Sequence, residues 1–467
     1  MATVRDFQVN NGLEVNANAN VVGNTVASDF LVNITGAANP PTAVFDFTKG
    51  VDPRITFTRS SNASYRAANG TIVYAGVNVP RINYDSNGVC QGLLCEQPST
   101  NDFTLSTNIG NTATGLWYVS GGDATAQAVT FNAITAPDGS NTATLFYHAT
   151  ANVTYKTLGT NFGVVTNRIY THSVFVKGAG EPYTNFLHFD GGDGLNVLSF
   201  TYYFSNNTFS AVSAGSSNCA VIGTPRSEPY ANGWYRISYS YHYTGGAASR
   251  YVTHKMDLDY GAAVIGRGFY VWGAQHEWND KPTSFIPTTT SAATRGWDFA
   301  SCTDSPSGNN LSSWFNQNQG TFLIEWNVPV TGPSTVTQYS GYPGPIVIWR
   351  PEDATNVIGH IFYNDATSGK TPAYETFNNN VNLGYMQAST GVANGVFYKS
   401  AFGYAANGHI WNHNGENTQS LVPTSQTTLA TKVEFGRSRA NGLQGHVRRV
   451  KYWSYRQANT NIYNATL

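Results

Sequence analysis

The sequence is poor in charged side chains. Only 11% of its 467 residues are Asp, Glu, Lys or Arg, against roughly 25% in ordinary globular domains. Surface helices normally carry faces of Lys and Glu, so this scarcity argues against helices and favours strands and turns that Gly, Asn, Ser and Thr keep soluble. The formal net charge is −1 and no basic block occurs. We therefore expect no nucleic-acid partner.

Long apolar runs and processing signals are also missing. No stretch reaches the length that a membrane-spanning helix needs, so we expect no membrane insertion. The first residues, MATVRDFQVNNG, have neither the basic start nor the apolar block of a secretory signal. We therefore expect no export by a cleaved signal.

Cysteine is scarce, with Cys90, Cys95, Cys219 and Cys302 in the whole chain. If residues 90–95 form one extended strand, its ends lie about 17 Å apart, which forbids a disulfide between Cys90 and Cys95. A turn within that stretch would relax this restriction. We expect free thiols and assembly in a reducing compartment. The absence of any CxxC pair disfavours a zinc site made by these cysteines.

The common catalytic motifs are absent as well. The chain has no G-x-S-x-G, no H-E-x-x-H and no complete G-x-x-x-x-G-K-[ST] phosphate-binding loop. A glycosidase needs two carboxylates at a fixed separation, for which Glu325 and Glu375 are candidates. Both are more simply interpreted as solvent-exposed residues of strands, so we expect no enzyme activity.

The pattern that is present is that of β-strands. In residues 234–243, WYRISYSYHY, apolar and polar side chains alternate, as in a half-buried antiparallel strand. Residues 199–209 alternate around Asn206 and Asn207, which can adopt the positive φ of a tight hairpin turn. Residues 268–277 continue this pattern, and no solenoid repeat occurs. We predict an all-β fold with antiparallel β-sandwich domains of the jelly-roll type.

Changes in composition divide the chain into five parts. Residues 1–40 have too little apolar surface for a core, so we expect an extended β arm that pairs with another chain or a larger body, with a disordered lead-in as the alternative. Residues 41–101 predict short strands that pack on the next domain. We expect a first jelly roll at 102–289, a linker at 290–312 and a second sandwich at 313–467.

Three stretches resemble proteins of one kind. Residues 45–101 contain DPRITFTR, NVPRI and a GLL-E-TN pattern similar to the opening module of many bacteriophage virion proteins. Residues 232–241 and 269–295 resemble later strands of the carbohydrate-binding-module-like jelly roll that follows this module in those proteins. Residues 320–459 resemble a laminin-G or concanavalin-A-like sandwich, in which the first and last strands are neighbours.

The resemblance implies a bacteriophage virion structural protein, a tail fibre, tailspike or head fibre that adheres to host surface glycan without catalysis. It also implies a homotrimer on the virion surface, assembled in the host cytoplasm. Residues 1–40 match no module, and by position they are expected to attach to other virion proteins. Alternatives are a capsid decoration (cement) protein and a polysaccharide-degrading tailspike. One departure is Cys95-Glu96, where the family commonly has an acidic pair.

Candidate sugar-binding residues follow from composition. Lectin-type sites stack a sugar ring on an exposed aromatic side chain and bind its hydroxyls with polar groups. The stretch NGHIWNHNGEN predicts a polar loop of this kind, and a second choice lies in residues 349–350. The candidates are Trp411, His409, His413, Asn414, Trp349 and Arg350. The alternative is that these aromatic residues belong to a sandwich core.

Two places have carboxylates that suit a metal ion. Asp190 and Asp193 lie in the Gly-rich HFDGGDG, and Asp257 and Asp259 share one face of MDLDY. Calcium binds six to eight oxygens. Jelly rolls similar to the one that this sequence resembles often hold a structural Ca²⁺ in this way. Because Asp and Gly are also ordinary turn residues, we expect no cofactor, with a structural Ca²⁺ as the alternative.

Overall fold

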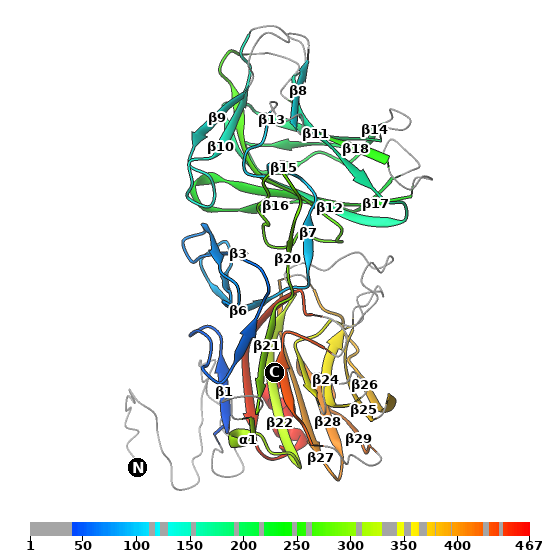
Figure 1. The fold of residues 1–467 in the computed structure, drawn as a ribbon. Coiled ribbons are helices and arrows are strands. Elements are labelled where there is room, and N and C mark those ends of the chain that lie inside the picture. The colour runs from blue at the N-terminus through cyan, green and yellow to red at the C-terminus, as the bar shows by residue number, and fades with distance from the viewer. Residues whose placement is uncertain are drawn as a thin grey trace, which may run out of the picture.

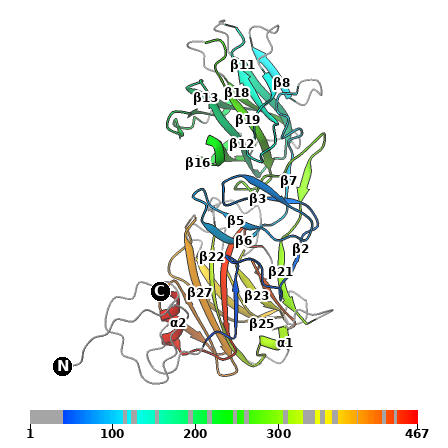
Figure 2. The same ribbon diagram turned by 90° about the vertical axis from the view of Figure 1, so that its left-hand side faces the viewer.

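The computed structural model shows an elongated molecule in which two β-sandwiches stand end to end (Figure 1). A narrow waist joins them, formed by the paired strands β7 (Ser99–Asn101) and β20 (Ala293–Arg295) beside a hairpin of β3 (Ala63–Arg66) and β4 (Ile72–Ala75). Figure 2 shows this hairpin between the two sandwiches from a second side. The structure describes residues 40–111, 117–121, 129–150, 156–190, 196–213, 219–244, 250–257, 264–304, 311–328, 343–349, 356–363, 371–378, 380–393, 395–423, 429–438 and 442–467.

One sandwich is built from segments far apart in the chain, and we call it the discontinuous sandwich. Its sheet I has eight strands, in the order β29-β28-β27-β22-β31-β6-β5, with β1 also paired to β31. Its sheet II has seven, in the order β2-β21-β30-β23-β24-β25-β26. The strands of sheet I are β1 (Ala43–Asp46), β5 (Ile82–Tyr84), β6 (Cys90–Cys95), β22 (Gln319–Asn327), β27 (Phe397–Ala405), β28 (His409–His413), β29 (Gln419–Leu421) and β31 (Gly445–Trp453). Those of sheet II are β2 (Thr56–Thr58), β21 (Phe299–Thr303), β23 (Ile346–Trp349), β24 (Val357–Tyr363), β25 (Pro372–Asn378), β26 (Val381–Gln387) and β30 (Lys432–Phe435).

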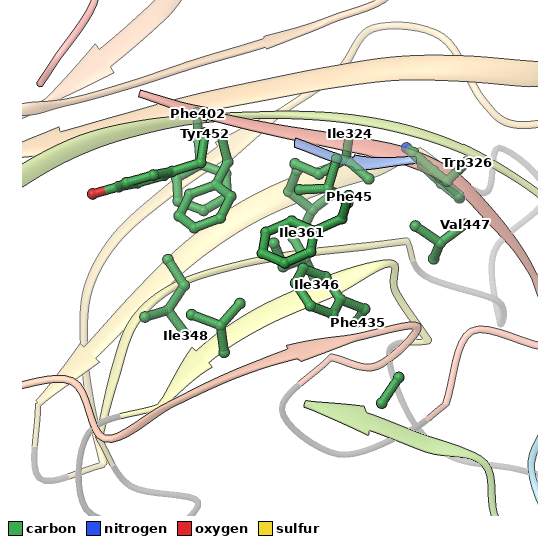
Figure 3. Packing of buried hydrophobic residues seen from close by; sticks show 14 of the residues in the cluster. Phe45, Ile324, Trp326, Ile346, Ile348, Ile361, Phe402, Phe435, Val447 and Tyr452 are labelled. Atoms are coloured by element: carbon green, nitrogen blue, oxygen red, sulfur yellow. The ribbon is translucent and has the colours of Figure 1, made fainter. Parts of the chain in front are cut away.

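Sheets I and II pack face to face around one apolar core (Figure 3). Successive side chains of a strand point to opposite faces, so Ile324 and Trp326 of β22 enter this core together. Phe45 of β1 and Leu93 of β6 lie in the same core and are fully buried. Burying a side chain of this size is worth roughly 2 kcal/mol. The N-terminal strands are therefore part of the core of this sandwich.

The other sandwich is a jelly roll made from one continuous part of the chain. Its sheet III has the order β16-β17-β12-β19-β10-β9, and its sheet IV has the order β15-β14-β13-β18-β11-β8. The strands of sheet III are β9 (Val129–Ile134), β10 (Ala143–Tyr147), β12 (Arg168–Ala179), β16 (Cys219–Pro229), β17 (Tyr235–Tyr243) and β19 (Gly268–Glu277). Those of sheet IV are β8 (Trp117–Gly121), β11 (Lys156–Val164), β13 (Tyr183–Asp190), β14 (Asn196–Tyr203), β15 (Thr208–Phe209) and β18 (Arg250–Asp257).

Helices are short among the described residues. A single turn, α1 (Leu311–Trp314), precedes β22, and α2 (Asn459–Thr466) ends the chain. Ile462 of α2 packs with Leu323 and Ile410 on the outer face of sheet I. Neither helix is long and apolar enough to cross a membrane.

The topology corrects the predicted role of residues 41–101. These residues were expected to pack on the domain that follows them. Instead, β1 and β6 pair with β31, the last strand of the chain, and β2 pairs with β21. The hairpin of β3 and β4 follows the prediction, since Ile72 packs with Trp234 and Trp272 of the jelly roll. So does β7, whose Asn101 is hydrogen-bonded to Ala274 and His276 of β19. The jelly roll is thus inserted into the discontinuous sandwich.

The linker predicted at 290–312 is also corrected. Part of it is β20, which pairs with β7, and part is β21, which lies inside sheet II between β2 and β30. Residues 293–295 and 299–303 are therefore strands that are stabilised by pairing with their neighbours, not parts of a linker. Residues 1–39 of the predicted arm lie outside the described residues.

The strand predictions themselves are confirmed. Residues 235–243 form β17, residues 268–277 form β19, and the hairpin at 199–209 contains β14 and β15, with Asn207 at a positive φ of 58°. The first and last strands of the second predicted sandwich, β22 and β31, are neighbours as expected. The all-β fold with antiparallel sandwiches is confirmed as well.

Candidate functional site

Five charged side chains meet at the waist and are almost completely buried: Arg59, Arg81, Glu96, Arg295 and Asp298. The Arg59 guanidinium donates to Asp298 at 3.0 Å. Arg81 lies between the two acids, 2.8 Å from the Glu96 carboxylate and hydrogen-bonded to Asp298. Arg295 approaches the same Glu96 carboxylate at 3.4 Å. We call these five residues the waist ion network.

The network joins the segments that the resemblance singled out. Arg59 ends DPRITFTR, Arg81 lies in NVPRI, and Glu96 follows GLLC. Burial alone would raise the pKa of Glu96, but Arg295, Arg81 and two hydrogen bonds from Ser284 outweigh it and lower this pKa to about 2. The carboxylate therefore stays charged. The three motifs meet in the waist ion network, and Ser284 links this network to the segment that follows the jelly roll.

Cys95 stands where the resembling proteins commonly have an acidic residue. Its side chain points into the core of the discontinuous sandwich, whereas that of Glu96 points into the waist ion network. The Cys95 side chain is 1% exposed, and its sulfur occupies the space that a Cβ on Gly436 would need. Burial raises the pKa of the Cys95 thiol well above its ordinary value. A carboxylate at this position would be buried among apolar groups, so a small neutral thiol suits it. All four cysteines have free thiols, as predicted.

The segment after β19 holds the waist from the jelly-roll side. Glu277, the last residue of β19, accepts hydrogen bonds from Ser99 at 2.6 Å and from Thr283 at 2.7 Å. The next residue, Ser284, donates its N–H and hydroxyl to Glu96 at 2.8 and 2.6 Å. A continuous path of hydrogen bonds therefore runs from the jelly roll into the discontinuous sandwich and fixes their relative orientation.

The same segment covers the outer face of sheet III. Arg236 and Ser240 of β17 donate to the carbonyls of Thr283 and Asp280 at 2.8 and 3.1 Å. Both residues are buried, so β17 is covered on both faces and is not the half-buried strand that its alternation predicted. Trp272 of β19 is buried, whereas Trp278 is 40% exposed, with the Arg168 guanidinium 3.5 Å from the centre of its ring.

A groove of about 710 Å³ opens beside this segment at the waist. Four parts of the chain form its walls: the β3–β4 hairpin with the two residues before it, Thr107 in the stretch between β7 and β8, the turn between β9 and β10, and the stretch 285–294. The lining residues are Ser61, Asn62, Ala63, Tyr74, Thr107, Asp138, Ser140, Thr142, Phe285, Ile286, Pro287, Ala293 and Thr294. We call this cavity the waist groove.

An aromatic ring and a carboxylate lie together in the waist groove. Tyr74 is 44% exposed, and its hydroxyl donates to Asp138 at 3.3 Å. The pKa of the Tyr74 phenol is raised, first by partial burial and then by the Asp138 carboxylate. The other oxygen of Asp138 accepts hydrogen bonds from the N–H and hydroxyl of Ser140, at 3.0 and 2.5 Å. These bonds fix the carboxylate in one orientation beside the ring.

Hydroxyl groups extend this polar wall. The Ser140 hydroxyl lies 2.6 Å from that of Thr142, which in turn accepts a hydrogen bond from the indole N–H of buried Trp272 at 2.9 Å. Phe285 and Ile286 also line the groove but are only 2% and 5% exposed, so the accessible aromatic surface is that of Tyr74. An exposed aromatic ring beside a row of oxygen acceptors matches the apolar face and the hydroxyl groups of a pyranose ring. The waist groove is therefore the candidate functional site.

The described residues that the sequence predicted to bind sugar do not line the waist groove. Trp411, His409 and His413 belong to strand β28, not to a loop, and each is at most 1% exposed. Trp411 lies in the core between sheets I and II, while His409 and His413 are hydrogen-bonded to Tyr374 and Ser400. The predicted loop position is therefore wrong. A ring buried in this way presents no face to a sugar.

The remaining candidates are separate from one another. Asn414 is exposed in the turn after β28, with a φ of 47°. Trp349 is 5% exposed at the end of β23, and its indole N–H donates to Glu434. Arg350 lies outside the described residues. The structure does not bring these residues together in one site.

The predicted metal ligands lie either at the ends of two strands or outside the described residues. Asp190 ends β13 and Asp257 ends β18, and the two strands are paired. Asp193 and Asp259 lie outside the described residues. Within the part of the chain that the structure describes, no group of three or more His, Cys, Asp or Glu side chains is placed to hold a metal ion.

The two carboxylates considered for glycoside hydrolysis do not form a pair. Ile324 and Trp326 point into the core, so Glu325 lies on the outer face of sheet I, where it approaches Arg449 at 3.9 Å. Tyr374 points into the same core, so Glu375 lies on the outer face of sheet II. Packed sheets stand about 10 Å apart, and the sandwich separates the two groups further than a glycosidase pair allows.

Sequence reasoning missed the waist groove because its residues carry no local signal. Tyr74 lies in IVYAG and Asp138 in APDGS, which read as a strand and an ordinary turn. Their contact joins positions 64 residues apart. The one available hint was the Pro-rich stretch after β19, whose residues 285–287 line the groove.

No family model and no curated protein matches the chain. Among solved structures, it is similar to CBM40 of the Ruminococcus gnavus IT-sialidase bound to α2,3-sialyllactose, with 12% identity, 35% of this chain and 91% of the other covered, and a TM-score of 0.28. A toad ovary galectin in complex with N-acetylgalactose matches at 10% identity over 30% and 92% of the chains, with a TM-score of 0.21. Domains LG4-5 of the mouse laminin α1 chain match at 9% identity over 66% and 87%, with a TM-score of 0.20. Identities and TM-scores this low carry no argument about function.

Proposed function

We propose that this chain is a non-catalytic glycan-binding protein and that the waist groove is its binding site. The observation that carries the proposal is the exposed ring of Tyr74 beside the fixed carboxylate of Asp138. A sugar would stack its apolar face on the ring and donate hydroxyls to Asp138, Ser140 and Thr142. The sandwiches on either side hold the walls of the groove in place.

A glycan array probed with the labelled full chain tests this proposal. We expect binding to a subset of oligosaccharides, and Tyr74→Ala should weaken binding to that subset by about tenfold, because it removes an aromatic stacking surface worth ~1.4 kcal/mol. Tyr385→Ala is the matched control, since Tyr385 is 49% exposed on β26 of the discontinuous sandwich, away from the waist groove. Equal losses in the two variants, or an array without any bound glycan, would refute the proposal.

The biological setting that we propose rests on the sequence resemblance. It is a bacteriophage virion fibre or tailspike, assembled in the host cytoplasm and displayed on the virion surface, with residues 1–40 attached to other virion proteins. The proposed assembly is a homotrimer. Light scattering of the full chain at micromolar concentration should then give the mass of three chains, and a stable monomer would contradict this part of the proposal.

A further inference from the structure

The charges around the waist groove bear on which sugars it accepts. Among the described residues that line it, Asp138 is the one that carries a formal charge. Its Oδ1 is occupied by Ser140, while its Oδ2 has the Tyr74 hydroxyl at 3.3 Å as its partner. A carboxylate oxygen offers two lone pairs, so Oδ2 retains acceptor capacity toward the groove.

The buried arginines of the waist ion network do not offset this charge inside the groove. Arg59 directs its donors to Asp298 and to the carbonyls of Ser61, Gly76 and Val79. Arg59, Arg81 and Arg295 are each at most 1% exposed. Their charge is committed to the waist ion network, and a ligand in the groove cannot reach their N–H groups.

We propose that the waist groove selects neutral glycans with free hydroxyl pairs and rejects sialylated and uronate-containing glycans, and that Asp138 determines this specificity. This inference rests on the proposed function. A neutral sugar can donate a hydroxyl to Asp138 Oδ2 while it stacks on Tyr74. An acidic sugar in the same place brings a second negative charge into a partly enclosed site, where like charges repel without a cation to pair them.

The composite wall also makes binding depend on the junction. The hairpin of β3 and β4 carries Tyr74, the jelly roll carries Asp138, and the segment between β19 and β20 carries the exposed Pro287. A ligand that contacts all three binds the assembled waist and not either sandwich alone. The full chain is therefore the form to be tested.

The test is a calorimetric titration of the full chain with pairs of oligosaccharides that differ in one terminal group, a neutral hexose or a sialic or uronic acid. We expect the neutral member of each pair to bind at least about tenfold more tightly. Asp138→Asn keeps an oxygen acceptor for Ser140 and should reduce this ratio to less than about threefold, mainly by admitting acidic sugars. Asp304→Asn, at an exposed site of the discontinuous sandwich near α1, is the control and should leave the ratio unchanged.

The outcomes separate the two proposals. Equal or tighter binding of acidic members by the unmodified chain overturns the inference on specificity and leaves glycan binding intact. A ratio unchanged by Asp138→Asn also overturns it, since another group must then select the sugar. Binding of no member of any pair overturns both the inference and the proposed function.

Discussion

The carboxylate of Glu96 is buried, yet it remains charged. Two arginines and the N–H and hydroxyl of Ser284 surround it, which compensates for the loss of water. Breaking a buried pair from one side costs about 3–5 kcal/mol, because the partner charge stays behind. At the scale of single residues, the waist is therefore held by charges that depend on one another.

Because the pKa of Glu96 is lowered in the folded state, its contribution to stability depends on pH. Its folded-state value of about 2 lies below the ordinary value of 4.5, so its contribution is present above about pH 4.5 and is lost as the pH falls toward 2. We expect Glu96→Gln to lower the free energy of unfolding at pH 7 by about 3–5 kcal/mol, the cost of breaking a buried pair from one side, and the difference from the unmodified chain to shrink as the pH falls from 4.5 toward 2. Denaturant unfolding at several pH values measures it.

Glu325→Gln is the control for this experiment. Glu325 is half-buried and lies 3.9 Å from Arg449, so its loss should change stability by less than ~1 kcal/mol. A Glu96→Gln variant that matched Glu325→Gln at pH 7, or whose deficit grew at low pH, would show that the waist ion network does not hold the junction.

At the scale of elements, the strands were predictable and their partners were not. Alternation in β17 and β19 shows in the sequence, because period-two patterns are local. The pairing of β1 with β31 joins Ala43 to Tyr452, and no local pattern carries such a contact. Trp411 shows the same limit at the site. Its polar neighbours suggested a loop, but His409 and His413 point inward because Tyr374 and Ser400 bind them.

The insertion of the jelly roll makes a sharp prediction about fragments. A fragment of residues 290–467 lacks β1, β2 and β6, and with them Phe45 and Leu93 of the core, so we expect it not to fold cooperatively. Asn101 and Ala293 are opposite each other across β7 and β20, so residues 40–101 joined to 293–467 by Asn-Gly can close a tight hairpin there. We expect this second fragment to fold, with reduced stability because Ser284 is missing.

Thermal unfolding followed by circular dichroism distinguishes the two fragments. The joined fragment should show a β-sheet spectrum and one cooperative transition. If residues 290–467 alone gave an equally cooperative transition, the C-terminal sandwich would be independent of the N-terminal strands, and the discontinuous arrangement would be wrong.

At the scale of the whole molecule, the waist is both the mechanical junction and the candidate binding site. The waist ion network and the hydrogen bonds of Glu277 fix one sandwich relative to the other. The waist groove lies on this fixed junction, with walls from the jelly roll and from the segments of the waist itself. A rigid site of this kind suits adhesion, because little conformational freedom is lost on binding.

Hydrogen exchange of the full chain, with and without a neutral oligosaccharide selected on the array, tests this account most directly. We predict slower exchange on binding in residues 61–75, 137–143 and 285–295, which line or adjoin the waist groove. Protection confined to residues 397–421, around Trp411, would contradict the account and would place the binding site in the discontinuous sandwich.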